Sequence, residues 1–180
     1  RTLLRTRRFY TGAEMITLYQ TNLLPCLEYR TPALYHACRN VLSRLDQVQT
    51  RFLRDAGVSE LEALTDFNLA PLQTRRDIAL LGLIHRTVLG QGPSHFRVFF
   101  KLSGETGHRH RFHLTDSRKG RLHKRSALGL VAIYNMLPEK IRDASAVKLF
   151  QTSLQGMLKQ AAGSSVGDWD GMFSPRRSLD

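Results

Sequence analysis

The segment Leu34–Gly57, LYHACRNVLSRLDQVQTRFLRDAG, carries the strongest helical pattern in the chain. Its apolar residues recur at alternating steps of four and three, at Leu34, Cys38, Val41, Leu45, Val48 and Phe52. This spacing places them on one face of an α-helix, and Gly57 is suited to end that helix. The pattern predicts one long amphipathic helix whose apolar stripe packs into a core. Four arginines lie off the stripe, at Arg39, Arg44, Arg51 and Arg54.

Helical patterns also precede this segment and follow it. A helix is expected from Ala13, with Ile16, Tyr19 and Leu23 on one face, and Pro25 should kink or end it. Pro32 is well placed to start the next helix. Ser59 and Glu62 match a capping box, which predicts a short helix.

Further helices are expected in the second half of the chain. Pro71 can open a long helix that Gly90 ends, Ser126–Met136 forms another, and Ser145 can cap the last. The first two helices each have a set of residues near one face, which are Leu72, Arg75, Ile78, Leu81, Ile84 and Val88, and Leu128, Val131, Ala132 and Asn135. The residues of the last helix that are expected to face inward are Val147, Phe150, Leu154, Met157 and Leu158. Alternating β patterns are scarce. The predicted fold is therefore all-α, an irregular multi-helix bundle with a basic loop or short hairpin around residues 103–125.

The predicted organisation has five regions. A basic arm (1–12) precedes a helical region (13–102), and a basic loop (103–125) follows it. A C-terminal helical pair (126–160) and an irregular tail (161–180) complete the chain.

The charge balance favours polyanionic partners. Twenty-seven Lys and Arg residues against fifteen Asp and Glu give a net charge of +12, which attracts polyanions over long distances. The cations gather near the N-terminus and between residues 101 and 125. From this clustering we predict phosphate contacts by Arg109, Arg111, Arg118, Lys119, Arg121, Lys124 and Arg125, followed by Arg5, Arg7 and Arg8. A solvated loop kept open by charge repulsion is the alternative interpretation of the same segment.

No residue pattern predicts catalysis, a metal or a cofactor. The acidic pairs Glu60/Glu62 and Asp168/Asp170 fall on an expected helix start and in a glycine-rich tail, so neither offers a rigid Mg²⁺ platform. His108, His110, His113 and His123 could be read as a zinc cluster, but Arg109 and Arg111 between them would repel a cation. We expect no catalytic residue, no metal and no cofactor.

Several further residues carry expectations that the structure can test. Cys26 and Cys38 are the only cysteines, which favours an intracellular, reducing compartment, and both are expected to be buried apolar side chains. No run of residues is long and apolar enough to span a bilayer. Tyr134 is expected to be a core aromatic with a satisfied hydroxyl. Glu28 and Tyr29 are expected to make local polar and packing contacts.

Three segments resemble parts of one protein family. LYQTNLLPCLEYRTPALYH (Leu18–His36), followed by LDQVQTRFLR (Leu45–Arg54), is similar to the region just past the palm of non-LTR (LINE-type) retrotransposon reverse transcriptases. RSALGLVAIYNMLPEKIRDASAVKLFQTSLQGML (Arg125–Leu158) resembles the Arg-Ser…Trp-Asn-x-Leu-Pro…Phe-Lys ending of many such reading frames. LAPLQTRRDIALLGLIHRTVLGQGPSHF (Leu69–Phe96) is similar to the connector between them. The sequence departs from the family pattern at Arg30, Tyr134 and Gln151.

The resemblance implies a thumb-like region and a C-terminal extension that lie beside a template-primer duplex. The family's Asp-Asp polymerase hairpin is absent from this sequence, so no catalytic residue is carried over. The parent protein would be an RNA-directed DNA polymerase, and this chain would be its detached or truncated downstream half. The expected function is non-catalytic binding of RNA or of an RNA/DNA duplex. The alternative is a helical scaffold that packs onto protein partners in a larger complex.

Overall fold

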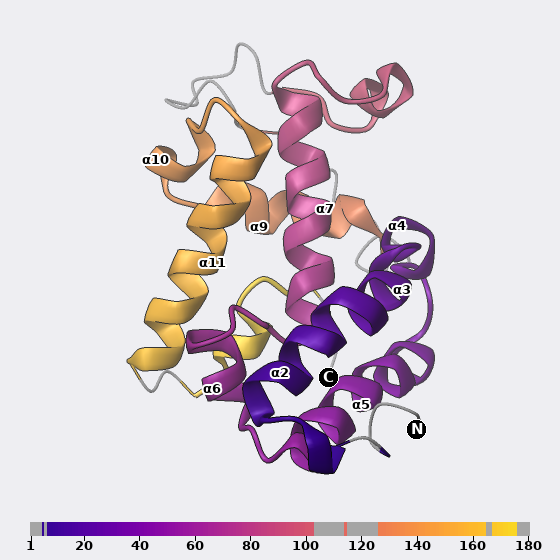
Figure 1. Cartoon of the computed structure of the whole chain (residues 1–180). Helices are drawn as coiled ribbons and strands as arrows, with labels where there is room; N and C mark the ends of the chain where they lie inside the picture. Colours follow the sequence, from indigo (N-terminus) through magenta and orange to yellow (C-terminus); the bar gives the residue numbers. More distant parts are fainter. Residues whose placement is uncertain (1–4, 6, 103–113, 115–125, 165–166, 176–180) are drawn as a thin grey trace. The chain divides into compact units, whose positions relative to one another are not determined.

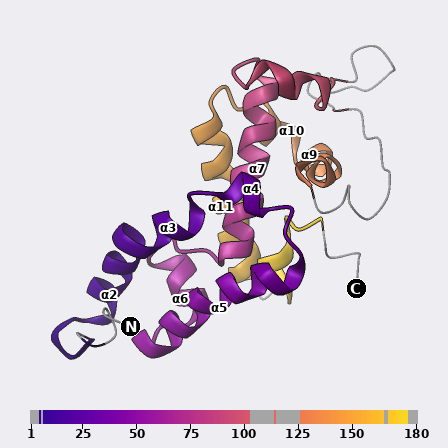
Figure 2. The same ribbon diagram turned by 90° about the vertical axis from the view of Figure 1, so that its right-hand side faces the viewer.

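The chain is helical throughout the part that the computed structural model describes, which covers residues 5, 7–102, 114, 126–164 and 167–175. These residues contain no strand, and an isolated antiparallel bridge joins Leu102 to Leu114. The predicted all-α class is therefore confirmed (Figures 1 and 2). The loop or hairpin expected at 103–125 lies outside the described residues, except for Leu114. No described helix has the length and apolar character to cross a membrane.

The chain divides into two compact units, and the boundary falls inside the predicted region 13–102. Unit 1 is Arg1–Arg76 and unit 2 is Asp77–Asp180. Unit 1 holds η1 (Arg7–Phe9), α2 (Gly12–Leu18), the π-helix η2 (Tyr19–Leu23), α3 (Leu24–Glu28), α4 (Thr31–Leu34), α5 (Arg39–Ala56) and α6 (Glu60–Thr65), and α7 (Leu72–Val88) begins there. Prolines occupy the first turns of α3 and α4, where a missing backbone N–H costs nothing.

The π-helix η2 corrects the predicted register of the first helix. We expected Leu23 to share a face with Tyr19, but Leu23 is exposed and Leu24 is buried in its place. In an α-helix, residues five apart point about 140° away from each other. Hydrogen bonding from residue i to i+5 brings them back to nearly the same side, and the Leu24 N–H donates to the Tyr19 carbonyl in this way. The π-helix therefore lets Tyr19 and Leu24 enter one core.

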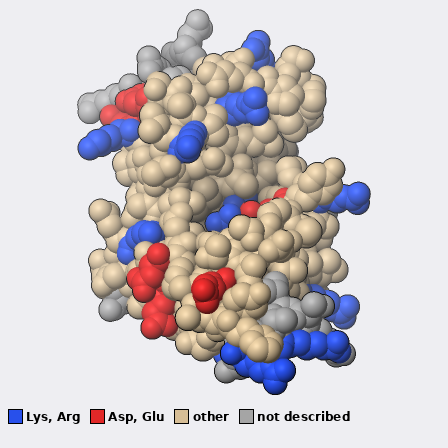
Figure 3. Space-filling view, in the orientation of Figure 1, with Lys and Arg blue, Asp and Glu red and all other residues tan. Residues whose placement is uncertain are grey.

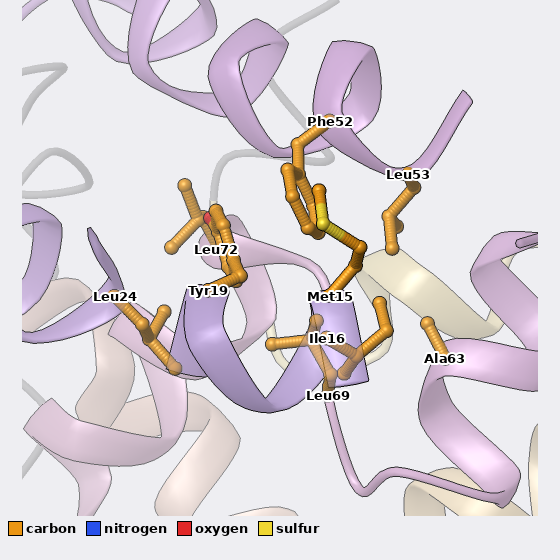
Figure 4. Close-up of a cluster of buried hydrophobic side chains, with 9 residues drawn as sticks. All are labelled: Met15, Ile16, Tyr19, Leu24, Phe52, Leu53, Ala63, Leu69 and Leu72. Carbon is orange, nitrogen blue, oxygen red and sulfur yellow. The ribbon is translucent and has the colours of Figure 1, made fainter. Parts of the chain in front are cut away.

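The core of unit 1 forms where α2, α5 and α6 meet the chain leading into α7. Tyr19 stacks on Phe52 of α5 with ring centroids 4.5 Å apart, and Met15 also points toward Phe52 (Figure 4). The buried cluster comprises Met15, Ile16, Tyr19, Leu24, Phe52, Leu53, Ala63, Leu69 and Leu72. α6 begins with the predicted capping box, in which the Ser59 side chain accepts from Glu62 N–H and the Glu62 carboxylate accepts from Ser59 N–H.

The long helix predicted from Leu34 is wrong in two respects. α5 begins at Arg39, so Leu34 belongs to the separate short helix α4. The buried residues of α5 are Leu42, Gln49, Phe52 and Leu53, whereas Val41 is 46% exposed and Val48 is 42% exposed. The buried face of α5 differs from the predicted one because it includes Gln49. The Gln49 amide accepts from Tyr19 OH (3.3 Å) and donates to the Ala70 carbonyl (3.0 Å), so this polar side chain is satisfied in the core. Gly57 ends α5 in the left-handed conformation at φ 74°, as predicted.

Unit 2 contains the rest of α7, which Gly90 follows at φ 75°. Its remaining helices are η3 (Ser94–Val98), η4 (Ala127–Gly129), α9 (Leu130–Met136), α10 (Glu139–Arg142), α11 (Val147–Gly163) and η5 (Trp169–Gly171). The helix expected from Ser126 thus begins as a short 3-10 turn, and α9 buries Leu130, Val131 and Tyr134. Ser145 does not cap α11, because the capping position is Ala146, which makes no side-chain bond.

α7 and α11 run side by side and hold the core of unit 2 (Figure 1). A Cβ at Gly82 would collide with the side chain of Gln151, so this glycine permits the close approach of the two helices. His85 of α7 stacks on Phe150 of α11 with ring centroids 4.2 Å apart. The predicted inward residues Phe150, Leu154 and Leu158 are buried, together with Ala162.

The Tyr-Asn-Met-Leu-Pro stretch makes structural contacts. Tyr134 OH lies 3.0 Å from His85 Nδ1, so its predicted burial with a satisfied hydroxyl is confirmed. The Asn135 amide accepts from Leu114 N–H (2.9 Å) and donates to the Leu114 carbonyl (2.8 Å). The Leu137 carbonyl accepts from Nε of Arg142, which is 6% exposed. This stretch therefore joins α7, residue 114 and α10 within unit 2.

Candidate nucleic-acid interface

The residues of the predicted interface fall in two places. Arg109, Arg111, Arg118, Lys119, Arg121, Lys124 and Arg125 lie outside the described residues. Near the N-terminus, Arg5 and Arg8 are exposed, and Arg7 begins the helix η1. The structure therefore tests the exposure of the N-terminal arginines alone, and the predicted contacts at 109–125 stay a prediction.

The structure adds a basic face on α5 that sequence analysis did not select. With Leu42, Gln49 and Leu53 turned inward, the opposite side of the helix carries Arg44 and Arg51, which are both exposed. Arg54 lies beside them, with a side chain that is 74% exposed. Residues 44 and 51 are two turns apart, which is roughly 10 Å along the helix axis. We call Arg44, Arg51 and Arg54 the α5 arginine face.

Most acidic groups of unit 1 are engaged inside the unit. Glu28 takes a two-point ion pair from Arg75, in which Nη2 lies 3.1 Å from Oε2 and Nε contacts Oε1. Asp46 accepts from the buried Arg76 at 2.6 Å. These pairs join α3 and α5 to the start of α7, and they turn Asp46 away from the α5 arginine face.

The capping carboxylates are engaged as well. Glu14 accepts from Thr11 backbone N–H at 2.8 Å and from the Thr11 hydroxyl at 2.9 Å, and these bonds lower the pKa of Glu14. Backbone and side-chain hydrogen bonds with Ser59 lower the pKa of Glu62 in the same way. Both carboxylates therefore serve helix starts within unit 1. The only acid in an ion pair with the α5 arginine face is Asp55, 3.7 Å from Arg54, among the described residues.

Tyr19 and Tyr134 are buried, neutral structural groups. Burial is the main cause that raises the pKa of Tyr19, and the nearby Glu28 carboxylate raises it further. Burial raises the pKa of Tyr134 too. His85 Nε2 lies 2.9 Å from the Ala144 carbonyl, which can only accept, so Nε2 carries the proton and Nδ1 accepts from Tyr134 OH. Burial lowers the pKa of His85, which keeps the ring uncharged near neutral pH.

Among the described residues of unit 1, three aromatic rings are exposed, those of Phe9, Tyr10 and Tyr29, and two of them, Phe9 and Tyr29, lie beside an arginine adjacent in sequence. Tyr29 is 80% exposed, so its expected role in packing is wrong, and the polar contact of Glu28 is with the distant residue Arg75 rather than local. The Arg30 guanidinium carbon lies 6.0 Å from the Tyr29 ring centroid. Phe9 is 69% exposed, and the Arg8 guanidinium carbon lies 4.9 Å from its centroid.

An apolar strip borders the α5 arginine face. Val41 and Val48 lie two turns apart on the same side of the helix, and both are exposed. Figure 3 shows Lys and Arg side chains in several separate groups, with Asp and Glu side chains beside some of them. On α5 itself, Val41 and Val48 provide apolar surface beside the arginines.

The cysteines correct another expectation. Cys26 and Cys38 are free thiols, but both are exposed rather than buried. Periodicity misled here because Cys38 caps α5 instead of lying within it. Within the described ranges, no three His, Cys, Asp or Glu side chains converge as they would around a metal ion.

In comparisons with family models, curated proteins and solved structures, nothing matches this chain.

Sequence reasoning missed the α5 arginine face for a specific reason. The four arginines of α5 were visible as residues off the apolar stripe, but the stripe itself was set in the wrong register. The residues that indicate the correct buried face are Leu42 and Leu53, which lie on one side of a helix together with Gln49. From sequence alone, a glutamine in that position is expected at the surface, because its buried hydrogen-bond partners are not known.

Proposed function

We propose that this chain is a non-catalytic, helical nucleic-acid-binding module that contacts the phosphates of RNA or of a template-primer duplex. One observation carries the proposal. α5 presents Arg44, Arg51 and Arg54 to solvent on one side, while the neighbouring Asp46 pairs with Arg76. Arginine matches phosphate oxygens in geometry, and contacts of this kind position a nucleic acid without reading its sequence.

Two properties of the sequence support the same proposal. The net charge of +12 favours binding to a polyanion, and a dense group of cations lies at 109–125. The resemblance to the downstream part of non-LTR retrotransposon reverse transcriptases, stated above, is consistent with a duplex as ligand. Within this proposal the chain acts in a reducing compartment and needs neither a metal nor a cofactor.

Salt dependence of binding tests the role of the α5 arginine face. The variant Arg44→Gln/Arg51→Gln/Arg54→Gln is titrated with a labelled RNA/DNA duplex at several salt concentrations. Removing one phosphate-binding cation lowers the slope of log K against log salt by roughly 1, so the triple variant should lower it by about 2 to 3. Lys148→Gln on the exposed surface of α11 is the matched control and leaves the slope unchanged. Wild-type protein that binds no duplex and no RNA at low salt would falsify the function.

A parallel variant tests the predicted cation strip of unit 2. Arg118→Gln/Lys119→Gln/Arg121→Gln removes three cations from the segment predicted from sequence. A fall of the slope similar to that of the α5 variant assigns phosphate contacts to both units. An unchanged slope confines the contacts to unit 1.

The scaffold alternative has an observation in its favour. Val41 and Val48 expose apolar surface along α5, and large exposed apolar patches mark sites of association. Sedimentation equilibrium of wild type and of Val41→Ser/Val48→Ser distinguishes the two functions. Self-association that the double variant abolishes, without a change in duplex affinity, favours the scaffold.

A further inference from the structure

The two exposed arginine–aromatic pairs of unit 1, Arg8–Phe9 and Arg30–Tyr29, are the strongest feature outside the α5 arginine face. Among the described residues, Tyr29 and Phe9 are the most exposed aromatic side chains, at 80% and 69%. Unit 1 buries Tyr19 at 0%, Tyr35 at 2% and Phe52 at 4%, and Tyr10 is less exposed than the two rings, at 44%. The unit therefore has a core able to bury aromatic surface, and these two rings lie outside it.

The backbone that carries Tyr29 is held in place. Glu28, the preceding residue, is fixed by the two-point ion pair with Arg75, and Tyr29 N–H donates to the Pro25 carbonyl at 2.9 Å. The carbonyl of Arg30 accepts from Leu34 N–H, also at 2.9 Å, at the start of α4. The corner between α3 and α4 (Figure 2) therefore presents the ring on a fixed support.

An exposed ring with a guanidinium on it suits a nucleobase. Bases stack on aromatic side chains whatever their identity, and arginine adds a cation–π contact or pairs with the adjoining phosphate. A base in a duplex already stacks on its neighbours and is paired, so its faces are not open to such a ring. Stacking on the exposed rings of Phe9 and Tyr29 therefore requires unpaired bases.

The spacing of the two rings adds a length requirement. Phe9 precedes and Tyr29 follows the helical run of α2, η2 and α3. This run has an axial rise of about 25 Å, so one base cannot touch both rings. A strand of several nucleotides is needed to reach from one ring to the other.

We propose that unit 1 binds a single-stranded nucleic acid by stacking unpaired bases on Phe9 and Tyr29, with Arg8 and Arg30 beside them. The inference rests on the proposed function and narrows it, since it names unpaired strands as the ligand of this surface. Phosphate contacts on α5 serve either form of nucleic acid, whereas the two rings discriminate between them.

The test uses the full chain and a single strand of about 12 nucleotides, within the site sizes known for single-strand binding proteins. One base is 2-aminopurine, whose fluorescence falls when it stacks on a ring. RNA and DNA strands are titrated separately, as is a fully paired duplex of the same sequence. The variants are Phe9→Leu, Tyr29→Leu and the double substitution, and Phe99→Leu, an exposed ring of unit 2, is the matched control.

We expect each substitution in unit 1 to weaken single-strand binding by roughly tenfold, because a stacked base contributes ~1–3 kcal/mol. The quenching of 2-aminopurine decreases as single-strand binding weakens. The affinity for duplex changes by no more than about twofold, well below the tenfold change that 1.4 kcal/mol represents. A strand that is too short to reach both rings contacts only one of them. One of the two substitutions then leaves the affinity for that strand unchanged. Circular dichroism checks that the variants keep their helices, which the exposure of both rings leads us to expect.

Two outcomes overturn the inference. The first leaves the proposed phosphate-binding function in place, and the second overturns that function as well. If the variants bind single strands as tightly as wild type, with unchanged quenching, the rings do not stack bases and the phosphate-binding function stands. If wild-type protein binds neither single strands nor duplex at low salt, both proposals fail. A preference between the RNA and DNA strands identifies the sugar and leaves the stacking assignment in place.

Discussion

Tyr19 in unit 1 and Tyr134 in unit 2 are both completely buried, but their hydroxyls are satisfied by different partners. Tyr19 donates to the Gln49 amide at 3.3 Å, and Tyr134 donates to the His85 imidazole at 3.0 Å. A phenylalanine completes each arrangement. A glutamine amide does not titrate, whereas an imidazole gains a proton near pH 6.5 when it is free in water. The Tyr19–Gln49 contact of unit 1 therefore does not titrate, whereas the Tyr134–His85 contact of unit 2 is sensitive to acid.

Removal of the stacked phenylalanines tests whether the two cores are equivalent. Phe52→Ala and Phe150→Ala should each lower the free energy of unfolding of their unit by about 3–5 kcal/mol, because each leaves a cavity in a packed core. Hydrogen exchange of α5 amides reports on unit 1. Fluorescence of Trp169, the only tryptophan, reports on unit 2. Phe99→Ala at an exposed position is the control, and a loss below about 1 kcal/mol for either core variant contradicts the comparison.

The hydroxyl partners provide the next test. Tyr134→Phe leaves the buried Nδ1 of His85 without a donor, which should cost about 1–3 kcal/mol. Tyr19→Phe should cost less, because the bond it removes is longer. Urea denaturation measures both, with Tyr29→Phe at an exposed position as the control. A larger loss for Tyr19→Phe than for Tyr134→Phe would reverse the ranking.

The pH dependence of stability separates the units most directly. Burial lowers the pKa of His85 in the folded state, so the unfolded chain takes up the proton first as pH falls through about 6.5. The contribution of neutral His85 is complete above that pH and is lost below it, by up to about 1.4 kcal/mol per pH unit. Urea denaturation of unit 2, followed by Trp169 fluorescence from about pH 7.5 to about pH 5, should show this loss. His85→Gln should abolish it.

The matched control for the pH experiment is His95→Gln, because His95 is exposed. This variant should keep the full pH dependence of unit 2. An acid-induced loss that persists in His85→Gln contradicts the assignment to the buried imidazole.

Helix caps give the smallest expected difference between the units. α6 in unit 1 begins with the Ser59 capping box, while α11 in unit 2 begins at Ala146 without a side-chain cap. Ser59→Ala should cost about 1 kcal/mol, and Ala146→Ser should add a similar amount. Ser145→Ala should change the free energy of unfolding by no more than a few tenths of a kcal/mol, because Ser145 is not the capping residue. Thermal denaturation ranks the three variants, and a loss of about 1 kcal/mol in Ser145→Ala would contradict the observed helix start.

The sequence predicted those parts of the fold that local patterns determine. The capping box at Ser59, the helix from Pro71 to Gly90 and the buried face of α11 follow from capping residues and periodicity. The α5 register could not be predicted in this way. A buried glutamine interrupts the apolar pattern, and only Tyr19 and Ala70, distant in sequence, make its burial favourable.

The sequence predicted that basic residues form the candidate site, but it did not predict which surface of the protein carries them. Clustered cations pointed to a polyanion, and the N-terminal residues Arg5 and Arg8 are exposed as expected. The α5 arginine face depends on which side of the helix is buried, and therefore on Gln49. The exposure of Tyr29 depends on how the chain turns between α3 and α4; Pro32 indicates where α4 begins but not which way the Tyr29 ring faces.

The π-helix at Tyr19–Leu23 makes this part of unit 1 tolerant of a change in chain length. Removing one residue from it would set Tyr19 and Leu24 four positions apart, the spacing at which an ordinary α-helix already aligns two side chains. Both neighbouring helices would then still bury the same faces. In evolutionary terms, η2 is a point where the deletion of one codon can pass without repacking the core.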